Sequence, residues 1–290
     1  MRTVAAVTDD ELRQERVAAL SDALGALRRV VVAFSGGADS AFLLAAAVRR
    51  LGPDAVVAAT AVSASLPSAE LAAAADFARH LGVEHLTPDT DEMSREGYRA
   101  NGADRCYFCK AELLDVLAPL ARARDAVVLT GTNADDAVAG FRPGIRAAGE
   151  RGALAPLRDA GLTKQQVRDT SRAWGLRTWD KPAAACLSSR IAYGLAITPT
   201  RLARIEQAEA GLRAALQAAG HDVTDLRVRD LGGGTARVEV SPGLVDVLRT
   251  DDVLRRAAGE WADVQVRAFR SGSMNDALLG YPVGTTPGSG

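Results

Sequence analysis

A short buried-strand pattern that breaks at a pair of glycines and restarts as a helix constrains this chain more than any other feature. The apolar run Val30–Phe34 leads into Ser-Gly-Gly-Ala-Asp-Ser at 35–40, and the helix-like run Ala41–Val48 follows directly. In such a turn several backbone N–H groups point into one concavity at the positive end of the helix dipole. With the hydroxyls of Ser35 and Ser40 beside them, these donors predict a site for an anion such as phosphate.

Asp39 does not suit a simple anion site, because its carboxylate would repel phosphate. A divalent cation between the two removes that conflict, and magnesium commonly bridges a carboxylate and phosphate oxygens. The segment 35–40 therefore predicts a site for magnesium and a phosphate group, with Asp39 as a magnesium ligand.

The spacing of the glycines excludes two common nucleotide motifs. A Walker P-loop needs four residues between its glycines and then Lys-Ser/Thr, and the dinucleotide fingerprint needs Gly-x-Gly-x-x-Gly. The segment instead resembles the PP-loop of the ATP pyrophosphatases, which implies cleavage of ATP between its α- and β-phosphates. By that resemblance the residues that bind ATP and its pyrophosphate are Ser35, Gly36, Gly37, Asp39 and Ser40. The alternative interpretation is an ordinary glycine-rich turn between a strand and a helix.

Composition describes an ordinary globular chain. It has 290 residues, enough for one or two domains, with 48% hydrophobic and 24% charged residues. The formal net charge of −1 provides no general attraction to nucleic acid or to an anionic membrane. The N-terminus lacks an apolar signal core, and no apolar stretch approaches the roughly 20 residues that span a bilayer. We therefore expect a cytoplasmic protein with no stable nucleic-acid partner and no membrane partner.

Strand-like and helix-like segments alternate from residue 9 to about 175, which predicts an α/β fold with a parallel sheet covered on both faces. The expected strands are 30–34, 55–61, 83–87 and 126–130, and the expected helices are 9–28, 41–51, 68–81, 107–123 and 164–175. Ligands of such sheets bind at the carboxyl ends of the strands. Because the strand 126–130 ends at that edge, Gly131, Asn133 and Asp135 are expected in the ATP site, although an Asx-capped turn would give the same pattern.

A second, smaller α+β unit is predicted from Thr198 onward, because Thr198 is a helix N-cap followed by Pro199. Its expected elements are a helix at 200–219, strands at 223–229 and 236–240 joined by the glycine turn 232–234, a helix at 244–258 and a strand at 262–269. The expected domains are 1–197 and 198–280, followed by a mobile Gly-, Pro- and Thr-rich tail at 281–290.

The three cysteines are not expected to form structural disulfides in a cytosolic chain. Cys106 and Cys109 form a Cys-x-x-Cys at the start of a helix, and Cys186 lies far along the chain in the segment 181–197, which lacks clear periodicity. A Cys-x-x-Cys alone is typical of a zinc half-site, a redox pair or two core thiols. A structural zinc would need four ligands, and no histidine has ligand spacing with these cysteines. Three thiolates on a four-iron cluster would leave one iron free to carry sulfide, and three unrelated thiols are the other interpretation.

Taken together, several segments resemble the LarE family, ATP-dependent sulfur transferases that build the nickel-pincer cofactor of lactate racemase. The resemblance covers nearly the whole chain and rests on the segments 35–40, 104–110, 131–136, 181–194 and 270–275. The last two, with Ala-Cys-Leu-Ser-Ser-Arg at 185–190 and Arg-Ser-Gly-Ser-Met-Asn at 270–275, are more specific than a PP-loop. The implied fold is the Rossmann-like sheet of the adenine nucleotide alpha hydrolase type.

The resemblance also implies the chemistry. ATP would adenylylate a carboxylate of pyridinium-3,5-biscarboxylic acid mononucleotide with release of pyrophosphate, and a sulfur nucleophile would displace AMP to leave a thiocarboxylate. Members with one cysteine at the position of Cys186 sacrifice its sulfur, whereas members with three are thought to carry sulfide on a four-iron, four-sulfur (4Fe-4S) cluster. Cys106, Cys109 and Cys186 favour the cluster form here, so the expected cofactors are ATP, Mg²⁺ and the cluster. The expected partners are a sulfide donor and further copies of the chain, in a hexamer.

Further site residues follow from the same resemblance. Arg227 and Arg229, two apart on a predicted strand, would bind the substrate phosphate, although a solvated strand face gives the same pattern. Glu209 and Asp246 would be metal-binding acids of the smaller unit, although exposed helix acids are common. The residues that would shape the loop around the third cysteine and the substrate are Ser188, Ser189 and Arg190.

Three other functions share parts of this pattern. A tRNA thiolase has the same loop and often a three-cysteine cluster, but it would need a basic surface and usually an RNA-binding module, and its binding would fall steeply with salt. An amide-forming ligase would use ammonia on the adenylate and would tolerate replacement of Cys186. A non-catalytic iron–sulfur or nucleotide sensor would release no pyrophosphate from ATP.

Overall fold

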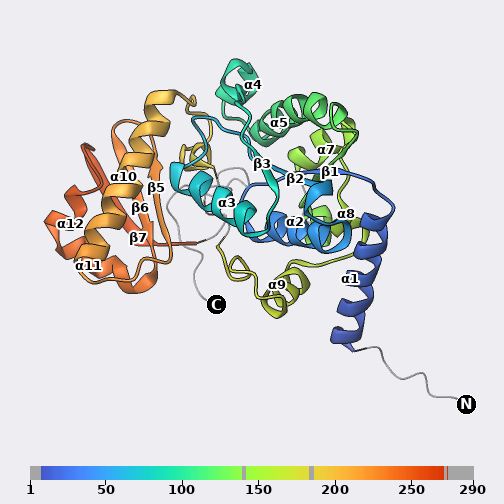
Figure 1. The fold of residues 1–290 in the computed structure, drawn as a ribbon. Helices are drawn as coiled ribbons and strands as arrows, with labels where there is room; N and C mark the ends of the chain where they lie inside the picture. Colours follow the sequence, from blue (N-terminus) through green and yellow to red (C-terminus); the bar gives the residue numbers. More distant parts are fainter. Residues whose placement is uncertain (1–7, 139–141, 183–185, 271–272, 274–290) are drawn as a thin grey trace, which may run out of the picture. The chain divides into compact units, whose positions relative to one another are not determined.

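The structure is a computed structural model that describes residues 8–138, 142–182, 186–270 and 273 (Figure 1). The chain divides into two compact units, Met1–Glu92 with Cys106–Ala184 and Met93–Arg105 with Ala185–Gly290. Residues 93–105 and 185–197 therefore group with the second unit, whereas the sequence pattern drew the boundary after residue 197. The expected tail 281–290 lies outside the described residues. Within the described ranges, no helix has the length and apolar character needed to cross a membrane.

The first unit is built on a parallel sheet of four strands in the order β3-β2-β1-β4. The strands are β1 (Val30–Ala33), β2 (Val56–Ala59), β3 (Glu84–Leu86) and β4 (Val127–Thr130). The predicted α/β fold with a parallel sheet is confirmed, and each strand lies within the residues expected for it. Because the strand order reverses between β1 and β4, the crevice outside their carboxyl ends is the place where such sheets bind ligands.

One helix precedes the first strand of the first unit, and helices follow each of its strands. They are α1 (Asp9–Gly25), α2 (Ala38–Leu51), α3 (Ser68–His80), α5 (Arg105–Arg122), α6 (Ala134–Val138), α7 (Pro143–Glu150), α8 (Pro156–Asp159) and α9 (Lys164–Ala173), with the 3-10 turns η1 (Pro53–Ala55) and η2 (Glu92–Ser94). Helix α9 begins with a capping box, in which the Thr163 hydroxyl accepts from the Gln166 N–H and the Gln166 side chain accepts from the Thr163 N–H. The helices α6, α7 and α8 were not expected, because such short segments show no periodicity.

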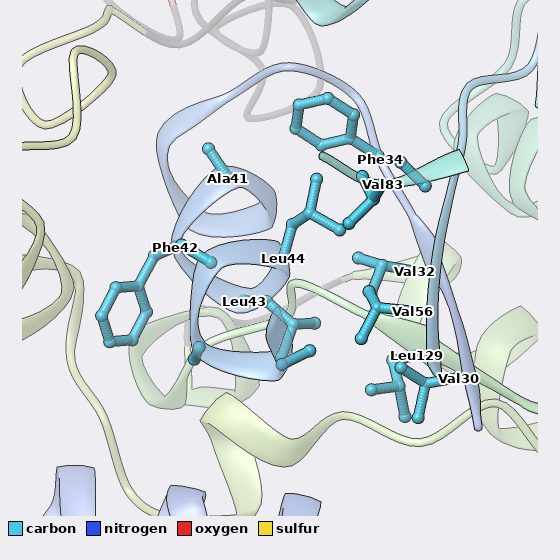
Figure 2. Packing of buried hydrophobic residues seen from close by; sticks show 14 of the residues in the cluster. Val30, Val32, Phe34, Ala41, Phe42, Leu43, Leu44, Val56, Val83 and Leu129 are labelled. Atoms are coloured by element: carbon cyan, nitrogen blue, oxygen red, sulfur yellow. The ribbon is translucent and has the colours of Figure 1, made fainter. Parts of the chain in front are cut away.

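Both faces of the parallel sheet are covered by apolar side chains. Figure 2 shows Leu43 and Leu44 of α2 on the side of the helix that faces Val32 of β1, and all three belong to one buried cluster. On the other face, Val31 packs in a second cluster with Leu117 of α5. Each fully buried side chain of this kind stabilises the fold by about 1.5–3 kcal/mol. The two clusters fix the start of α2 at the carboxyl end of β1.

The second unit is built on a three-stranded sheet in the order β5-β6-β7 (Figure 1). Its elements are α4 (Glu96–Arg99), η3 (Leu187–Arg190), α10 (Pro199–Ala218), β5 (Leu226–Asp230), β6 (Thr235–Val240), η4 (Pro242–Leu244), α11 (Val245–Thr250), α12 (Asp252–Arg256) and β7 (Asp263–Ala268). β5 and β6 are antiparallel, and the predicted glycine turn joins them with positive φ at Gly232, Gly233 and Gly234. One face of the sheet packs against Leu212 of α10 through Val228 and Val238.

The prediction of a single helix over 244–258 is wrong, because the structure has two helices there, α11 and α12. The backbone of Asp251 is extended between α11 and α12, and its Oδ1 accepts a hydrogen bond from the Leu254 N–H at 3.0 Å. An aspartate that accepts in this way caps the start of a helix, so a new helix begins there. The predicted cap of α10 is confirmed, because the Thr198 hydroxyl accepts from the Arg201 N–H.

Candidate functional site

A cavity of about 420 Å³ opens at the carboxyl edge of the parallel sheet, within the first unit. Its wall includes Ser35, Asp39 and Ser40 from the turn between β1 and α2, and Gly131 from the end of β4. These two segments lie against each other, since a Cβ at Gly131 would be 2.9 Å from Ser40 N. The sheet thus brings together the two segments that the sequence assigned to one edge.

The turn after β1 is held in shape by its own hydroxyls. Ser35 Oγ lies 3.2 Å from Ser40 Oγ, and Ser40 Oγ donates to the Gly37 carbonyl at 3.1 Å. Gly36 has a φ of +71°, a conformation that favours glycine. Among the described residues no side chain caps the start of α2, whose N-cap is Gly37. Unpaired N–H donors at the positive end of a helix suit a phosphate group.

Two carboxylates line the cavity, Asp39 and Asp136. Burial raises the pKa of Asp39 above its ordinary value, although Lys164 and the amide of Asn133 favour its ionised form. Asp136 Oδ1 lies 3.4 Å from Lys164 Nζ. Carboxylate oxygens beside a phosphate-binding turn are the ligands that magnesium prefers. Asp39 and Asp136 therefore fit a magnesium ion, and Asp136 was not among the expected site residues.

Asn133 and Asp135, which were expected in the ATP site, are not among the described residues that line the cavity, and they support residues that do. Asp135 Oδ2 accepts from the Lys164 N–H at 2.8 Å, so it anchors the start of α9. Asn133 is fully buried, and its Oδ1 accepts from the Asp136 N–H at 3.0 Å. Its Nδ2 forms no hydrogen bond of normal geometry in the described part of the chain, although the amide is near enough to Asp39 to favour the ionised form of that carboxyl. A buried amide donor in that condition is available to a bound ligand.

Positive side chains that the sequence analysis missed also line the cavity. They are Lys110, Lys164, Arg168 and Lys181. Lys164 and Arg168 lie four apart at the start of α9, where the helix dipole disfavours cations, and that unfavourable placement was the available signal for an anion site. Lys181 Nζ donates to the Gly36 carbonyl at 3.0 Å and pairs with Glu70 at 2.7 Å. Together these cations offset the charge of a bound polyphosphate.

A hydrogen-bonded chain beneath the cavity fixes the proton on His85. Thr60, which lines the cavity, donates its hydroxyl proton to the Phe34 carbonyl at 2.7 Å. The Thr60 oxygen lies 2.8 Å from His85 Nε2, so His85 must donate from Nε2. Burial lowers the pKa of His85. The neutral ring therefore supports the cavity floor without adding charge.

Helix α5 links the cavity to the Cys-x-x-Cys pair. Lys110 and Leu113 of this helix line the cavity, and Cys106 and Cys109 precede them by four residues each. Residues four apart share a helix face, so both thiols lie on the face of α5 that also bears these two lining residues, one turn toward the start of the helix. Cys106 is exposed and Cys109 is half-buried. Burial lowers the pKa of Lys110, and the Cys109 thiolate opposes that shift.

The third cysteine stands at the start of η3 in the second unit. Cys186 Sγ lies 2.9 Å from Ser188 Oγ, and the Cys186 carbonyl accepts from Ser189 Oγ at 2.7 Å and from Arg190 Nη1 at 3.0 Å. Arg190 is almost completely buried and pairs with Glu209 at 2.9 Å. These contacts hold the loop in one conformation around the thiol.

Arg105 and Asn101 support the same loop from inside the second unit, and sequence reasoning missed both. Arg105 Nη1 donates to the Ser188 carbonyl at 3.0 Å and to Asn101 Oδ1 at 2.6 Å. Asn101 Nδ2 donates to the carbonyl of Leu195 at 3.0 Å, and its φ is +54°. A single asparagine and a single arginine form no sequence pattern, so the sequence offered no signal for either residue. In the structure, the left-handed backbone of Asn101 is the feature that distinguishes this position.

Arg227 and Arg229 lie on the face of β5 that is opposite to the core residue Val228. Arg229 is 6% exposed and pairs with Glu239 at 2.9 Å. The guanidinium carbon of Arg227 lies 5.5 Å from the ring centre of Phe269. The alternative interpretation, a solvated strand face, does not hold for Arg229, which is buried.

The two acids expected to bind a metal lie in different surroundings. Glu209 is engaged by Arg190 and also accepts from the Val228 N–H at 3.0 Å. Asp246 is 92% exposed on α11 and lies 3.7 Å from Arg249. Within the described ranges, no three His, Cys, Asp or Glu side chains gather as a metal-binding group.

The chain is similar to one protein family and to several individual proteins. The asparagine synthase family matches residues 11–231. The uncharacterised protein slr1717 of Synechocystis sp. is 38% identical over 262 residues, which cover 88% of this chain and 94% of that protein. The pyridinium-3,5-bisthiocarboxylic acid mononucleotide synthase of Lactiplantibacillus plantarum is 33% identical over 268 residues, which cover 90% of this chain and 93% of that enzyme.

Proposed function

The chain belongs to the LarE family of PP-loop ATP pyrophosphatases, and from that premise we propose that it is an ATP-dependent sulfur transferase of nickel-pincer cofactor synthesis. Its substrate is pyridinium-3,5-biscarboxylic acid mononucleotide, and each ring carboxylate becomes a thiocarboxylate. The product in the name of the L. plantarum enzyme, pyridinium-3,5-bisthiocarboxylic acid mononucleotide, supports this assignment. The structural observation that supports it best is the cavity at the uncapped start of α2, whose wall includes the helix that begins with two cysteines.

The first half-reaction is adenylylation. The N–H groups at the start of α2 hold the β- and γ-phosphates of ATP, and Lys164, Arg168 and Lys181 reduce their repulsion of an incoming carboxylate. A carboxylate oxygen of the substrate forms a bond to Pα, the bond between Pα and the bridging oxygen to Pβ breaks, and pyrophosphate leaves with that electron pair. Asp39 and Asp136 would hold Mg²⁺, which stabilises charge on the departing oxygens.

The second half-reaction is displacement of AMP by a sulfur nucleophile. Sulfur bonds to the carbonyl carbon of the acyl adenylate, the bond from that carbon to the AMP oxygen breaks, and the thiocarboxylate remains. Adenylylation is required because a free carboxylate is a poor electrophile, whereas AMP is a good leaving group. The Ser188 hydroxyl and Arg190 position the loop that carries Cys186.

The three cysteines are the donor set for the cluster form. Thiolates are the ligands that iron–sulfur clusters prefer, and Cys106 and Cys109 lie one turn apart on α5, as two ligands of one cluster require. Cys106, Cys109 and Cys186 would hold a 4Fe-4S cluster, which supplies sulfide on the iron that no cysteine binds. The partners of this activity are a sulfide donor and further copies of the chain.

The test uses protein purified without oxygen and supplied with ATP, Mg²⁺, sulfide and the dicarboxylate nucleotide. We expect bound iron and sulfide, pyrophosphate release that requires the nucleotide substrate, and a thiocarboxylate product seen by mass spectrometry. An unchanged protein mass after turnover indicates the cluster route. A loss of about 34 Da, one H₂S, indicates that Cys186 gives up its own sulfur as nucleophile.

Two variants separate the half-reactions. Asp39→Asn is expected to lose pyrophosphate release, and Cys186→Ala to keep it while losing the thiocarboxylate. Formation of an amide from ammonia, undiminished in Cys186→Ala, would contradict sulfur transfer and indicate an amide-forming ligase. ATP left intact in the presence of the nucleotide substrate would indicate a sensor, and tight, salt-sensitive binding of tRNA would indicate a thiolase.

A further inference from the structure

Two rows of side chains cross the face of the second unit's sheet that is opposite to its core. The strand register aligns Arg227 with Glu239 and Glu239 with Arg267, which makes the first row. The second row aligns Arg229 with Arg237 and Arg237 with Gln265. Residues two apart on a strand, and partners in register, share a face. The first row places a carboxylate between two arginines, and the second row places two arginines opposite each other.

Glu239 is already fully engaged. Its side chain has no exposed surface, and it accepts hydrogen bonds from Arg229 at 2.9 and 3.1 Å. It also accepts from Arg267 Nε at 3.0 Å and from the Ser273 hydroxyl at 3.0 Å. A carboxylate has about four acceptor positions, and these donors occupy them. Glu239 therefore cannot serve as the partner of a further guanidinium.

Among the described residues, Arg237 forms no ion pair with a carboxylate, and the charge of Glu239 opposes the lowering of its pKa only in part. It is 6% exposed, and its hydrogen bond in the described part of the chain is to Gln265 Oε1 at 3.3 Å, a neutral group. Burial lowers the pKa of Arg237, and the charges of Arg267 and Arg229 act in the same direction. Buried charges in proteins are normally paired, because desolvation of an unpaired ion is costly. Two like charges facing each other on a sheet add to that cost.

We propose that Arg237 and Arg229 together bind an oxyanion of the nucleotide substrate, either its phosphate or a ring carboxylate. The inference rests on the proposed function, and it adds Arg237 to the substrate-binding residues. A guanidinium presents a planar fork of N–H donors that matches phosphate and carboxylate oxygens, so two adjacent forks suit one such group. Glu239 acts on this site as a positioning residue, because it accepts from Nε and Nη2 of Arg229. The Ser189 carbonyl accepts from Nη1 of Arg229 at 3.1 Å, so within the described residues one N–H of Nη1 and one of Nη2 are left for the oxyanion.

The first test measures thermal stability of the full chain with and without inorganic phosphate. In phosphate-free buffer, Arg237→Met is expected to melt at or above the wild-type temperature, since an uncompensated buried charge is replaced by an apolar chain. Phosphate at ten times its Kd is expected to raise the wild-type melting temperature by about 3 °C or more, with a clearly smaller rise in Arg237→Met. Phosphate bound at the cavity of the first unit is common to both proteins and cancels in the comparison.

Two further variants keep this test decisive. Arg255→Met removes a partly exposed arginine of α12 that pairs with Asp252, and it should respond to phosphate as the wild type does. Arg237→Lys keeps the charge without the fork and should retain a reduced response. The proposal is overturned if Arg237→Met is destabilised in phosphate-free buffer and responds to phosphate as strongly as Arg255→Met, because Arg237 would then be a structural group.

The second test identifies the bound group by calorimetric titration. Nicotinamide mononucleotide carries the phosphate without a ring carboxylate, and nicotinic acid riboside carries the carboxylate without the phosphate. One of the two is expected to bind wild type at least about tenfold more tightly than Arg237→Met, as loss of a charge-assisted bidentate pair predicts. Equal binding of both ligands by wild type and variant overturns the proposal. Neither titration involves turnover, so a failed sulfur-transfer assay would leave this result standing.

Discussion

The cavity of the first unit and the arginine-rich sheet face of the second unit both gather positive charge, by different means. The cavity uses backbone N–H groups at the start of α2, and its cations are accompanied by Asp39 and Asp136. The sheet face uses buried guanidinium groups, with Glu239 shared between Arg229 and Arg267. A site made by backbone geometry depends on the space that a glycine leaves, whereas a site made by buried charges depends on every partner.

The largest effect is expected from Glu239→Gln, which tests whether the sheet face of the second unit depends on its buried charges. Removal of this carboxylate's charge leaves the buried Arg229 and the partly exposed Arg267 without their anion, so the free energy of unfolding should fall by about 3–5 kcal/mol, measured by urea titration. The matched change Glu260→Gln, at an exposed residue, should stay within about 0.5 kcal/mol of wild type. Equal losses in the two variants would show that the second unit does not depend on its buried charges.

The same carboxylate predicts a pH dependence. Burial opposes ionisation of Glu239, but the charge of Arg229 and hydrogen bonds from Arg267 and Arg229 outweigh burial and hold its pKa below the ordinary 4.5. Its folded pKa is thus lower than its unfolded pKa, so its stabilising contribution is complete above pH 4.5 and is lost as the pH falls through the folded pKa. Glu239→Gln should lose this part of the acid sensitivity.

A smaller effect is expected from Gly131→Ala in the first unit. The new Cβ would lie 2.9 Å from Ser40 N and 3.0 Å from Ser40 Cα, which are backbone atoms that cannot move aside without displacing the start of α2. We expect a loss of about 1–3 kcal/mol in unfolding free energy and a pyrophosphate release reduced more than tenfold.

Gly149→Ala is the control for that prediction. Gly149 lies in α7 with nothing within 4 Å of its added Cβ, so alanine should stabilise the helix by up to about 1 kcal/mol. If Gly131→Ala keeps wild-type stability and activity, then close backbone approach does not determine the cavity.

The smallest effect is expected from Lys181→Met. This change removes the partly buried pair with Glu70 and the hydrogen bond to the Gly36 carbonyl, so stability should fall by only about 0.5–1 kcal/mol. The KM for ATP should rise several-fold, because the carbonyl of the phosphate-binding turn loses its tether. Arg79→Met, at an arginine that is 74% exposed, should change neither quantity. An unchanged KM in Lys181→Met would show that the turn holds its shape alone.

The phosphate-binding turn was predictable because its determinants are local. The apolar run Val30–Phe34 requires a buried strand, and the glycine pair that follows requires the chain to turn. Lys110, Lys164 and Lys181 were not predictable as neighbours, because they reach one cavity only after three distant segments pack on the same sheet edge. No local sequence pattern predicts that these three lysines line the same cavity.

In the second unit, too, local sequence predicted the secondary structure but not the contacts between segments that are distant in the chain. The alternation around Arg237 predicted a strand with this residue on its polar face. Its burial and its position opposite Arg229 follow from the register between β5 and β6, which the glycine turn sets. That no carboxylate pairs with Arg237 within the described residues follows from the alignment of all three strands, which places Arg229 and Gln265 beside it.

Helix α5 has one further consequence, since it bears both a cavity-lining ammonium group and two thiols. At 1.5 Å of rise per residue, Cys106 precedes Lys110 by about 6 Å along the helix axis. The fixed rise of the helix therefore determines the distance between these sulfur atoms and a nucleotide bound at Lys110. Cys106 and Cys109 belong to the same unit as the cavity, so their distance from a ligand in the cavity is set within that unit, whereas Cys186 belongs to the other unit.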